Sequence, residues 1–197
     1  MLRLVGTEGT EEMERQMSKL ACTLWLTGFS ASGKTTLAQA LAETLAADEV
    51  PHQVLDGDVV RQHLSRDLGF SREDRRENIR RVAELCRQLN DDGIVAIAAL
   101  ISPYRDDRNL ARQTVGQARF IEVYLSTPLA VCEARDPKGL YRQARDGVIA
   151  SFTGISAPYE EPLSPDLSLD TAVQPLDECV SLTADLLAAR WLGEDTF

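Results

Sequence analysis

Short apolar runs alternate with longer amphipathic segments along most of the chain. Runs without polar positions are typical of buried parallel strands, and apolar residues spaced by three and four positions are typical of helices packed against them. The expected strands are 24–26, 53–56, 94–101, 120–125 and 167–169. The expected helices are 36–47, 59–64, 71–90, 106–117, a short one from 127 and a closing one at 176–192. This alternation predicts an α/β fold whose parallel sheet is covered by helices on both faces.

The long helix from residue 71 has clear signals at both ends. Ser71 and Asp74 have the spacing of a capping box, with Asp in the acidic position. Ile79 and Val82 begin its apolar stripe, and the turn residues 90–93 end it.

Two parts of the chain fall outside the strand and helix alternation. Residues 136–147 are polar and charged and end in glycine, which we interpret as a helical flap, and with the irregular proline-containing stretch after it they form a mobile lid over about 136–160. Residues 1–20 are rich in acids and are interpreted as a loosely ordered or helical N-terminal extension. The remainder, 21–197, is expected to be a single domain, since the length suits one sizeable core.

The first expected strand leads into Gly28-Phe29-Ser30-Ala31-Ser32-Gly33-Lys34-Thr35, which fits G-x-x-x-x-G-K-[ST] with a helix following. In such a P-loop, backbone amides and the helix N-terminus hold phosphates, the lysine reaches the outer phosphates and the hydroxyl holds Mg²⁺. A glycine-rich and serine-rich turn that binds nothing is the alternative, which the presence of both Lys34 and Thr35 disfavours. The residues predicted to bind a nucleoside triphosphate are Gly28, Ser30, Ala31, Ser32, Gly33, Lys34, Thr35 and Thr36, with Thr35 as the Mg²⁺ ligand.

Net charge and cysteine usage restrict the partners and the compartment. The net charge of −10 argues against nucleic acid and against an anionic membrane surface, and no apolar run is long enough to span a membrane. Eight arginines nevertheless lie between Arg61 and Arg87, where they either receive an anion or form an exposed helix face. The four cysteines are scattered and flanked by apolar residues, so we predict buried thiols in a reducing compartment, the cytoplasm.

Missing motifs narrow the type of P-loop protein. No Asn-Lys-x-Asp motif reads a guanine base, and the most apolar strand ends in Ile101-Ser102-Pro103 without an acid. Asp56 and Asp58 end another strand, which we expect to lie beside the P-loop strand. A carboxylate near the γ-phosphate suits a small-molecule kinase, because it can orient the acceptor hydroxyl. Asp58 is the better candidate for this role, although an Asp-Gly turn without function is an alternative.

Two aromatic residues in loops suggest what the acceptor is. Phe70 and Phe152 are each flanked by polar or turn residues, and each alone fits a core position. As a pair near arginines they could hold a purine between their rings. Arg61, Arg75 and Arg80 would then bind an anion, and Asn78 would hydrogen-bond to the acceptor.

The chain resembles the adenylyl-sulfate (APS) kinase family over about residues 23–171. The resemblance is carried by Asp56-Gly57-Asp58 with Arg61, by Asp67-Leu68-Gly69-Phe70-Ser71, by Asp74-Arg75 with Glu77-Asn78-Ile79-Arg80-Arg81, by Ile101-Ser102-Pro103-Tyr104-Arg105, by Phe120-Ile121-Glu122-Val123, by Asp136-Pro137-Lys138-Gly139-Leu140-Tyr141 and by Phe152-Thr153-Gly154-Ile155 with Pro158-Tyr159-Glu160. It implies transfer of a phosphoryl group from ATP to adenosine 5′-phosphosulfate, giving ADP and 3′-phosphoadenylyl sulfate (PAPS), a step of sulfate assimilation.

The resemblance also implies roles for individual residues. The implied catalytic residues are Lys34, Asp58 and Ser102, the last described in some members as phosphorylated, although direct in-line transfer needs no such step. The implied APS site comprises Asp58, Arg61, Phe70, Arg75, Asn78, Ile101, Ser102, Lys138, Phe152 and Thr153, and the arginine cluster described above adds Arg80. Mg²⁺ accompanying ATP, a homodimer and a functional association with ATP sulfurylase are further implications.

One residue departs from the family pattern. Val59 stands where the family has asparagine after Asp58, which could lower substrate affinity. A related kinase acting on another nucleotide or a sugar is therefore one alternative. A non-catalytic subunit that binds a nucleotide is another, although the intact Lys34, Thr35 and Asp58 argue against it.

Overall fold

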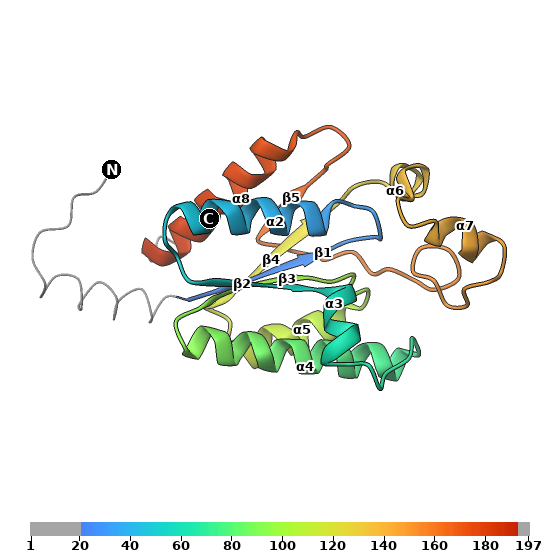
Figure 1. The fold of residues 1–197 in the computed structure, drawn as a ribbon, viewed down its shortest axis with the longest axis horizontal. Coiled ribbons are helices and arrows are strands. Elements are labelled where there is room, and N and C mark those ends of the chain that lie inside the picture. The colour runs from blue at the N-terminus through green and yellow to red at the C-terminus, as the bar shows by residue number, and fades with distance from the viewer. Residues whose placement is uncertain (1–20, 193–197) are drawn as a thin grey trace, which may run out of the picture.

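The structure, a computed structural model, describes residues 21–192 and is built on a five-stranded sheet (Figure 1). Its strands are β1 (Thr23–Thr27), β2 (His52–Asp56), β3 (Val95–Ala99), β4 (Phe120–Leu125) and β5 (Leu167–Leu169). They lie in the order β2-β3-β1-β4-β5, and every pairing is parallel. The predicted fold class is confirmed.

Helices cover both faces of the sheet, as its composition requires. Helices α2 (Lys34–Ala47) and α8 (Leu176–Leu192) lie on one face, and α3 (Gly57–His63), α4 (Arg72–Asp91) and α5 (Arg105–Val115) lie on the other (Figure 1). Every residue of β1, β3 and β4 is buried, so these strands must be covered on both sides. Two separate apolar clusters result, one on each face of the sheet.

The predicted helices and strands are all present among the described residues, and their ends have local causes. Helix α4 begins after Ser71, whose hydroxyl accepts a hydrogen bond from the Asp74 amide at 3.0 Å, as the capping pattern predicted. Helix α3 begins at Gly57, two residues before the predicted start, because the Asp56 carboxylate accepts from the Asp58 amide at 2.9 Å and acts as the N-cap.

The predicted neighbour of the P-loop strand was wrong. Strand β3, not β2, pairs with β1 on this side, so β2 with Asp56 lies one strand further away. Burial explains the order: β3 is buried along its whole length, whereas β2 buries only Leu55 and leaves Gln53 exposed, which suits an edge position.

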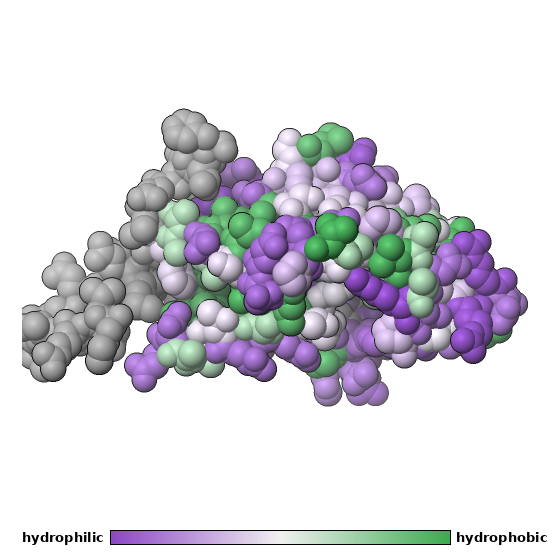
Figure 2. Space-filling view, turned by 90° about the horizontal axis from the view of Figure 1, so that it is seen from above, coloured by the Kyte–Doolittle hydropathy of each residue, from purple (hydrophilic) through white to green (hydrophobic). Residues whose placement is uncertain are grey.

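The segment predicted as a lid extends past the carboxyl ends of the strands. It follows α6 (Leu129–Arg135) and contains α7 (Leu140–Arg145), and Figure 1 shows both helices at that end of the molecule. Figure 2 shows that this end is mostly hydrophilic. The predicted extension 1–20 lies outside the described residues. Within residues 21–192, no helix combines the length and hydropathy needed to cross a membrane.

Candidate active site

The loop between β1 and α2 closes tightly around its own backbone. Gly28 has φ 148°, and a Cβ there would lie 2.7 Å from the Leu125 carbonyl oxygen, so only glycine fits. Gly33 caps α2 without any side-chain hydrogen bond to the helix amides. The first-turn amides of α2 have no intrahelical acceptor, and together with the helix dipole they form a site for an anion.

The Lys34 side chain lies folded against this loop. Its Nζ donates to the carbonyl oxygens of Gly28 at 2.9 Å and Phe29 at 2.5 Å. Burial lowers the pKa of Lys34 to about 8, because the charged amine loses water, and the nearby Asp56 carboxylate only partly offsets this. A phosphate beside Nζ would restore the charge.

Thr35 and Asp56 form an oxygen pair at the mouth of the loop. Thr35 Oγ1 donates to Asp56 Oδ2 at 2.7 Å. This hydrogen bond joins the start of α2, which follows β1, to the end of β2, which lies two strands away from β1 in the sheet. A hydroxyl and a carboxylate are ligands that suit Mg²⁺, which otherwise keeps waters and phosphate oxygens.

A pocket of about 520 Å³ lies over the loop. Of the predicted nucleotide-binding residues it is lined by Ser30, Ala31, Gly33, Lys34, Thr35 and Thr36. Gly28 and Ser32 do not line it, and Ser32 is fully buried beneath the loop, where its carbonyl accepts a hydrogen bond from Thr171 at 2.9 Å. The pocket is thus large enough for a nucleotide and has the phosphate loop along one wall.

A second part of the pocket wall was missed by the sequence analysis. It comes from the end of α6 and from the segment after β5, with Arg135, Thr171 and Gln174. Arg135 donates to the Thr171 hydroxyl at 2.8 Å and to its carbonyl at 2.7 Å, which joins the two segments. The one available signal was that Thr171 follows the carboxyl end of a parallel strand, where ligand sites gather.

Asp58 and Lys138 connect this pocket to the side expected to hold the acceptor. Lys138, on the lid, lines the pocket and forms an ion pair with the Asp58 carboxylate of α3. That hydrogen bond raises the pKa of Lys138. Both side chains are more than half exposed, so the pair can exchange its partners for a ligand.

Arg61 and Phe70 lie together on the outer side of Asp58. The Arg61 guanidinium stacks 4.3 Å above the Phe70 ring and donates to the Gly69 carbonyl at 2.8 Å. Phe70 is 59% exposed, so its ring is accessible to a flat ligand.

Arg75 joins this surface to the lid. Its guanidinium donates to the Phe70 carbonyl at 3.0 Å, to the Ser151 carbonyl at 2.6 Å and to the Thr153 hydroxyl at 3.2 Å. On the next turn of α4, Asn78 is 4% exposed, and its Oδ1 has no hydrogen-bond partner. A buried acceptor without a partner is costly, so this amide oxygen is suited to a donor on a ligand.

Two predicted acceptor residues are engaged elsewhere. Arg80 makes two hydrogen bonds to Glu77 on the same helix, at 2.8 and 2.9 Å, and its side chain is half exposed. Phe152 is 9% exposed and packs edge-on against Tyr141 of the lid, with ring centroids 5.0 Å apart. The two predicted stacking rings are therefore unequal, one exposed on the surface and one packed inside the lid.

Ser102 lies just after the carboxyl end of β3, and its hydroxyl is enclosed. The residue is 2% exposed, its Oγ accepts from Trp25 Nε1 at 3.1 Å, and it donates to Thr27 Oγ1 at 3.0 Å. Both hydrogen-bonding directions of this hydroxyl are thus occupied within the protein. This geometry gives no support to a phosphorylated Ser102.

Comparison with known proteins relates the chain to one family. The profile of the family described as adenylylsulphate kinase matches residues 20–170. An adenylyl-sulfate kinase of Pseudomonas entomophila is 52% identical over 169 residues, which are 86% of this chain and 81% of that protein. One from Shewanella amazonensis is 50% identical over 176 residues, 89% of each chain.

Solved structures agree with these relatives. The Mycobacterium tuberculosis APS kinase CysC in complex with AMPPNP and APS has a TM-score of 0.83 at 44% identity, over 85% of this chain and 98% of that one. A hexameric APS kinase from Thiobacillus denitrificans has a TM-score of 0.67 at 30% identity, over 96% of this chain and 34% of that one. A gluconokinase from Sinorhizobium meliloti, at 18% identity and a TM-score of 0.58, shares the fold alone.

Proposed function

The chain belongs to the adenylylsulphate kinase family, and from that premise we propose how its own residues carry out the reaction. The reaction produces PAPS and ADP from APS and ATP, with the γ-phosphoryl group passing to the 3′-hydroxyl of APS. The observation that carries the assignment of residues is the Asp58–Lys138 ion pair. It stands between the pocket above the phosphate loop and the surface formed by Arg61 and Phe70.

ATP occupies the pocket above the P-loop in this proposal. Its phosphates accept hydrogen bonds from the first-turn amides of α2 and from the Lys34 amine. Its base lies toward Arg135 and Gln174. The pocket supports this orientation, because Arg135 and Gln174 line it together with the phosphate loop. The relative from Mycobacterium tuberculosis, whose complex contains AMPPNP, agrees with a triphosphate here.

The pair formed by Thr35 and Asp56 is suited to hold the Mg²⁺ that accompanies ATP. The fit rests on the chemistry of the two oxygens, 2.7 Å apart, and on the expectation that Mg²⁺ takes one or two protein ligands besides phosphate and water. When bound, Mg²⁺ neutralises charge on the phosphates.

APS occupies the surface beyond Asp58. Its adenine stacks on the exposed Phe70 ring, and Asn78 Oδ1 accepts a hydrogen bond from it. Arg61 faces the phosphosulfate. When the adenine takes the place of the Arg61 guanidinium on the Phe70 ring, the guanidinium is free to bind this anion. Arg75, already bonded to Ser151 and Thr153, positions the lid segment next to the base rather than clamping the anion.

Asp58 orients the 3′-hydroxyl for in-line attack. Once ATP draws Lys138 toward the phosphates, the Asp58 carboxylate is free to accept the hydrogen bond of the acceptor hydroxyl. Lys34 and Lys138 stabilise the charge on the transferred group, and the lid excludes water. Because the transition state of such transfers is loose, positioning contributes more than the basicity of Asp58.

Asp58→Asn tests this assignment with Asp56→Asn as the matched control. We expect Asp58→Asn to lower kcat with APS by roughly 100-fold or more, with the KM for ATP changed less than about twofold. Asp56→Asn should instead raise the Mg²⁺ concentration needed for half-maximal rate. Equal losses in kcat and in ATP affinity for Asp58→Asn would make this residue structural.

The choice of acceptor is tested by a coupled assay of ADP formation with APS, AMP, CMP and gluconate. We expect turnover with APS alone, in spite of Val59, because Asp58 and Arg61 flank the substitution on either side.

The homodimer, the cytoplasmic location and the association with ATP sulfurylase stay predictions. A hexameric relative makes light scattering of the purified protein the direct measurement of its oligomeric state.

A further inference from the structure

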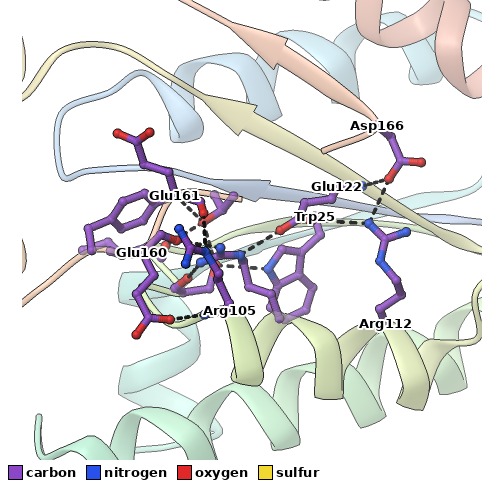
Figure 3. Close-up of polar contacts among 12 residues, drawn as sticks. Trp25, Arg105, Arg112, Glu122, Glu160, Glu161 and Asp166 are labelled. Atoms are coloured by element: carbon purple, nitrogen blue, oxygen red, sulfur yellow. Dashed lines mark hydrogen bonds and ion pairs between the residues drawn. The ribbon is translucent and has the colours of Figure 1, made fainter. Parts of the chain in front are cut away.

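The C-terminal end of the lid is hydrogen-bonded to the turn that follows β3. The Glu160 amide donates to the Pro103 carbonyl at 2.8 Å, and the Glu160 carboxylate accepts from the Arg105 amide at 2.9 Å. Arg105 Nε donates to the Glu161 carbonyl at 2.7 Å. Figure 3 shows Arg105 beside both glutamates. Residues 159–161, called the return strap below, are thus held by backbone and side-chain bonds.

Arg108 of α5 lies behind this junction and connects three segments. Its Nε donates to Glu122 Oε1 on β4 at 2.8 Å, its Nη1 to the Ser102 carbonyl at 2.7 Å, and its Nη2 to the Glu160 carbonyl at 2.7 Å. The Arg108 side chain is 3% exposed and that of Glu122 10%, so the ion pair is shielded from water. The planar guanidinium fixes the sheet, the turn after β3 and the return strap relative to one another.

The turn that Arg108 holds is conformationally strained. Ser102 has φ 38°, a conformation that is unfavourable for a residue with a Cβ and that persists only where surrounding contacts hold it in place. Arg108 binds its carbonyl, and Trp25 and Thr27 bind its hydroxyl. Ile101, immediately before it, accepts a hydrogen bond from Thr27 through its carbonyl at 2.8 Å.

Tyr159 fastens the return strap to the strand that carries the phosphate loop. Its hydroxyl lies 2.9 Å from Thr27 Oγ1, the last residue of β1. Its ring stands 4.8 Å from Phe29 in the phosphate loop and 6.0 Å from Tyr124 on β4. The Thr27 hydroxyl is therefore hydrogen-bonded both to Tyr159 of the return strap and to Ser102. One small polar cluster thus joins the lid, the β3 turn and the P-loop.

We propose that Arg108, held by Glu122, is a positioning residue for the acceptor site. It acts through the Ile101–Ser102 turn and through the end of the lid, and touches neither substrate itself. The inference rests on the proposed function in so far as Ile101 and Ser102 belong to the APS site. The lid then moves about its anchored end at the return strap, so the strap determines where Phe152 and Thr153 come to rest.

Arg112 provides a matched control one turn further along α5. It pairs with the same Glu122, at 3.3 Å, and with Asp166 at 3.0 Å, as Figure 3 shows. Its hydrogen bonds go to Phe120, Glu122 and Asp166, and so to neither the β3 turn nor the return strap. Replacing either arginine by lysine keeps a cation next to Glu122, but only the change at Arg108 removes the bridge between Ser102 and Glu160.

The experiment measures steady-state kinetics and hydrogen exchange of Arg108→Lys and Arg112→Lys. For Arg108→Lys we expect the KM for APS to rise about tenfold, because small displacements of positioning groups have large effects, and the KM for ATP to stay within about twofold. The peptides that cover 101–106 and 158–162 should exchange faster. Arg112→Lys should resemble the unchanged protein in both measurements. Tyr159→Phe, which removes a single hydroxyl, should shift both measurements in the direction of Arg108→Lys, and it serves where that variant does not fold.

Three results would overturn the proposal. The first is an APS KM that is the same in Arg108→Lys and Arg112→Lys. The second is faster exchange at both segments with an unchanged APS KM, since the cluster would then hold the strap without serving the acceptor. The third is an equal rise in both KM values, which indicates general loosening. Exchange does not depend on the assignment of Asp58, so a failure here is separable from a failure of the proposed site.

Discussion

At the scale of the residue, Lys34 shows how burial determines charge at the site. Its amine is bonded to two carbonyl oxygens of the loop and lies away from water, and burial brings its pKa down to about 8 from 10.5. Two neutral carbonyl oxygens do not compensate the ammonium for the water that it loses on burial, because neither carries a full negative charge. In the proposed complex the phosphates of ATP supply the missing anion, so nucleotide binding and protonation of Lys34 are linked.

We therefore expect ATP affinity to fall as the pH rises above about 8. In the free protein Lys34 loses its proton there, whereas phosphate contact raises its pKa in the complex, so binding takes up a proton and weakens by up to about tenfold per pH unit. Calorimetric titration with ATP between pH 7 and 9.5 measures this. Lys34→Met, as control, should bind weakly and without this pH dependence. Constant affinity of the unchanged protein across that range would contradict the linkage.

At the scale of the element, the lid is stabilised by a small apolar cluster of its own. Cys132, Tyr141, Ala144 and Phe152 are buried together, and Phe29 of the phosphate loop packs against them. The Tyr141 hydroxyl also donates to the Ser30 carbonyl at 3.0 Å. This part of the lid thus shares one interface with the phosphate loop, so displacing it also displaces the loop proposed to bind ATP.

Gly154→Ala and Gly147→Ala test this coupling as a pair. Both glycines have positive φ within the lid, but a Cβ at 154 would meet Leu129 Cδ1 at 2.9 Å and Phe29 Cε1 at 3.0 Å, whereas a Cβ at 147 meets nothing within 4 Å. Both changes should cost roughly 1–3 kcal/mol of backbone strain. Only Gly154→Ala should also raise the KM for ATP, by roughly fivefold, since it displaces the phosphate loop. Equal ATP KM values for the two variants would show that lid and loop are independent.

At the scale of the whole molecule, the sheet has an apolar cluster on each face. Leu41 of α2 belongs to the cluster on one face and Leu89 of α4 to the cluster on the other. Strands β1 and β3 supply residues to both clusters alternately, so the two layers share one sheet. Loss of packing on either face is therefore expected to destabilise the same cooperative unit.

Leu41→Ala and Leu89→Ala should each lower the free energy of unfolding by about 2–5 kcal/mol, with the smaller loss at the less deeply buried Leu89. Because the two side chains lie on opposite faces, the double variant should show the sum of the single losses and one transition. Urea denaturation followed by circular dichroism and by tryptophan fluorescence measures this. Two separate transitions would mean that the layers unfold independently.

The donor half of the site was accessible from sequence because it is local. A P-loop requires glycines, a lysine and a hydroxyl within eight consecutive residues, and the same residues build the turn that they need. The element pattern was accessible for a similar reason, since apolar periodicity and the Ser71 cap act over short distances. The resemblance in the other motifs named the reaction.

Only the tertiary structure decided what depends on strand order and on contacts between distant segments. The place of β3 between β1 and β2 and the wall formed by Arg135 with Thr171 were not encoded locally. The same holds for Ser102, whose enclosed hydroxyl and strained backbone depend on Trp25 and on Arg108. The physical reason is that burial and partner choice are properties of the assembled layers, whereas a motif specifies only the groups that its own backbone brings together.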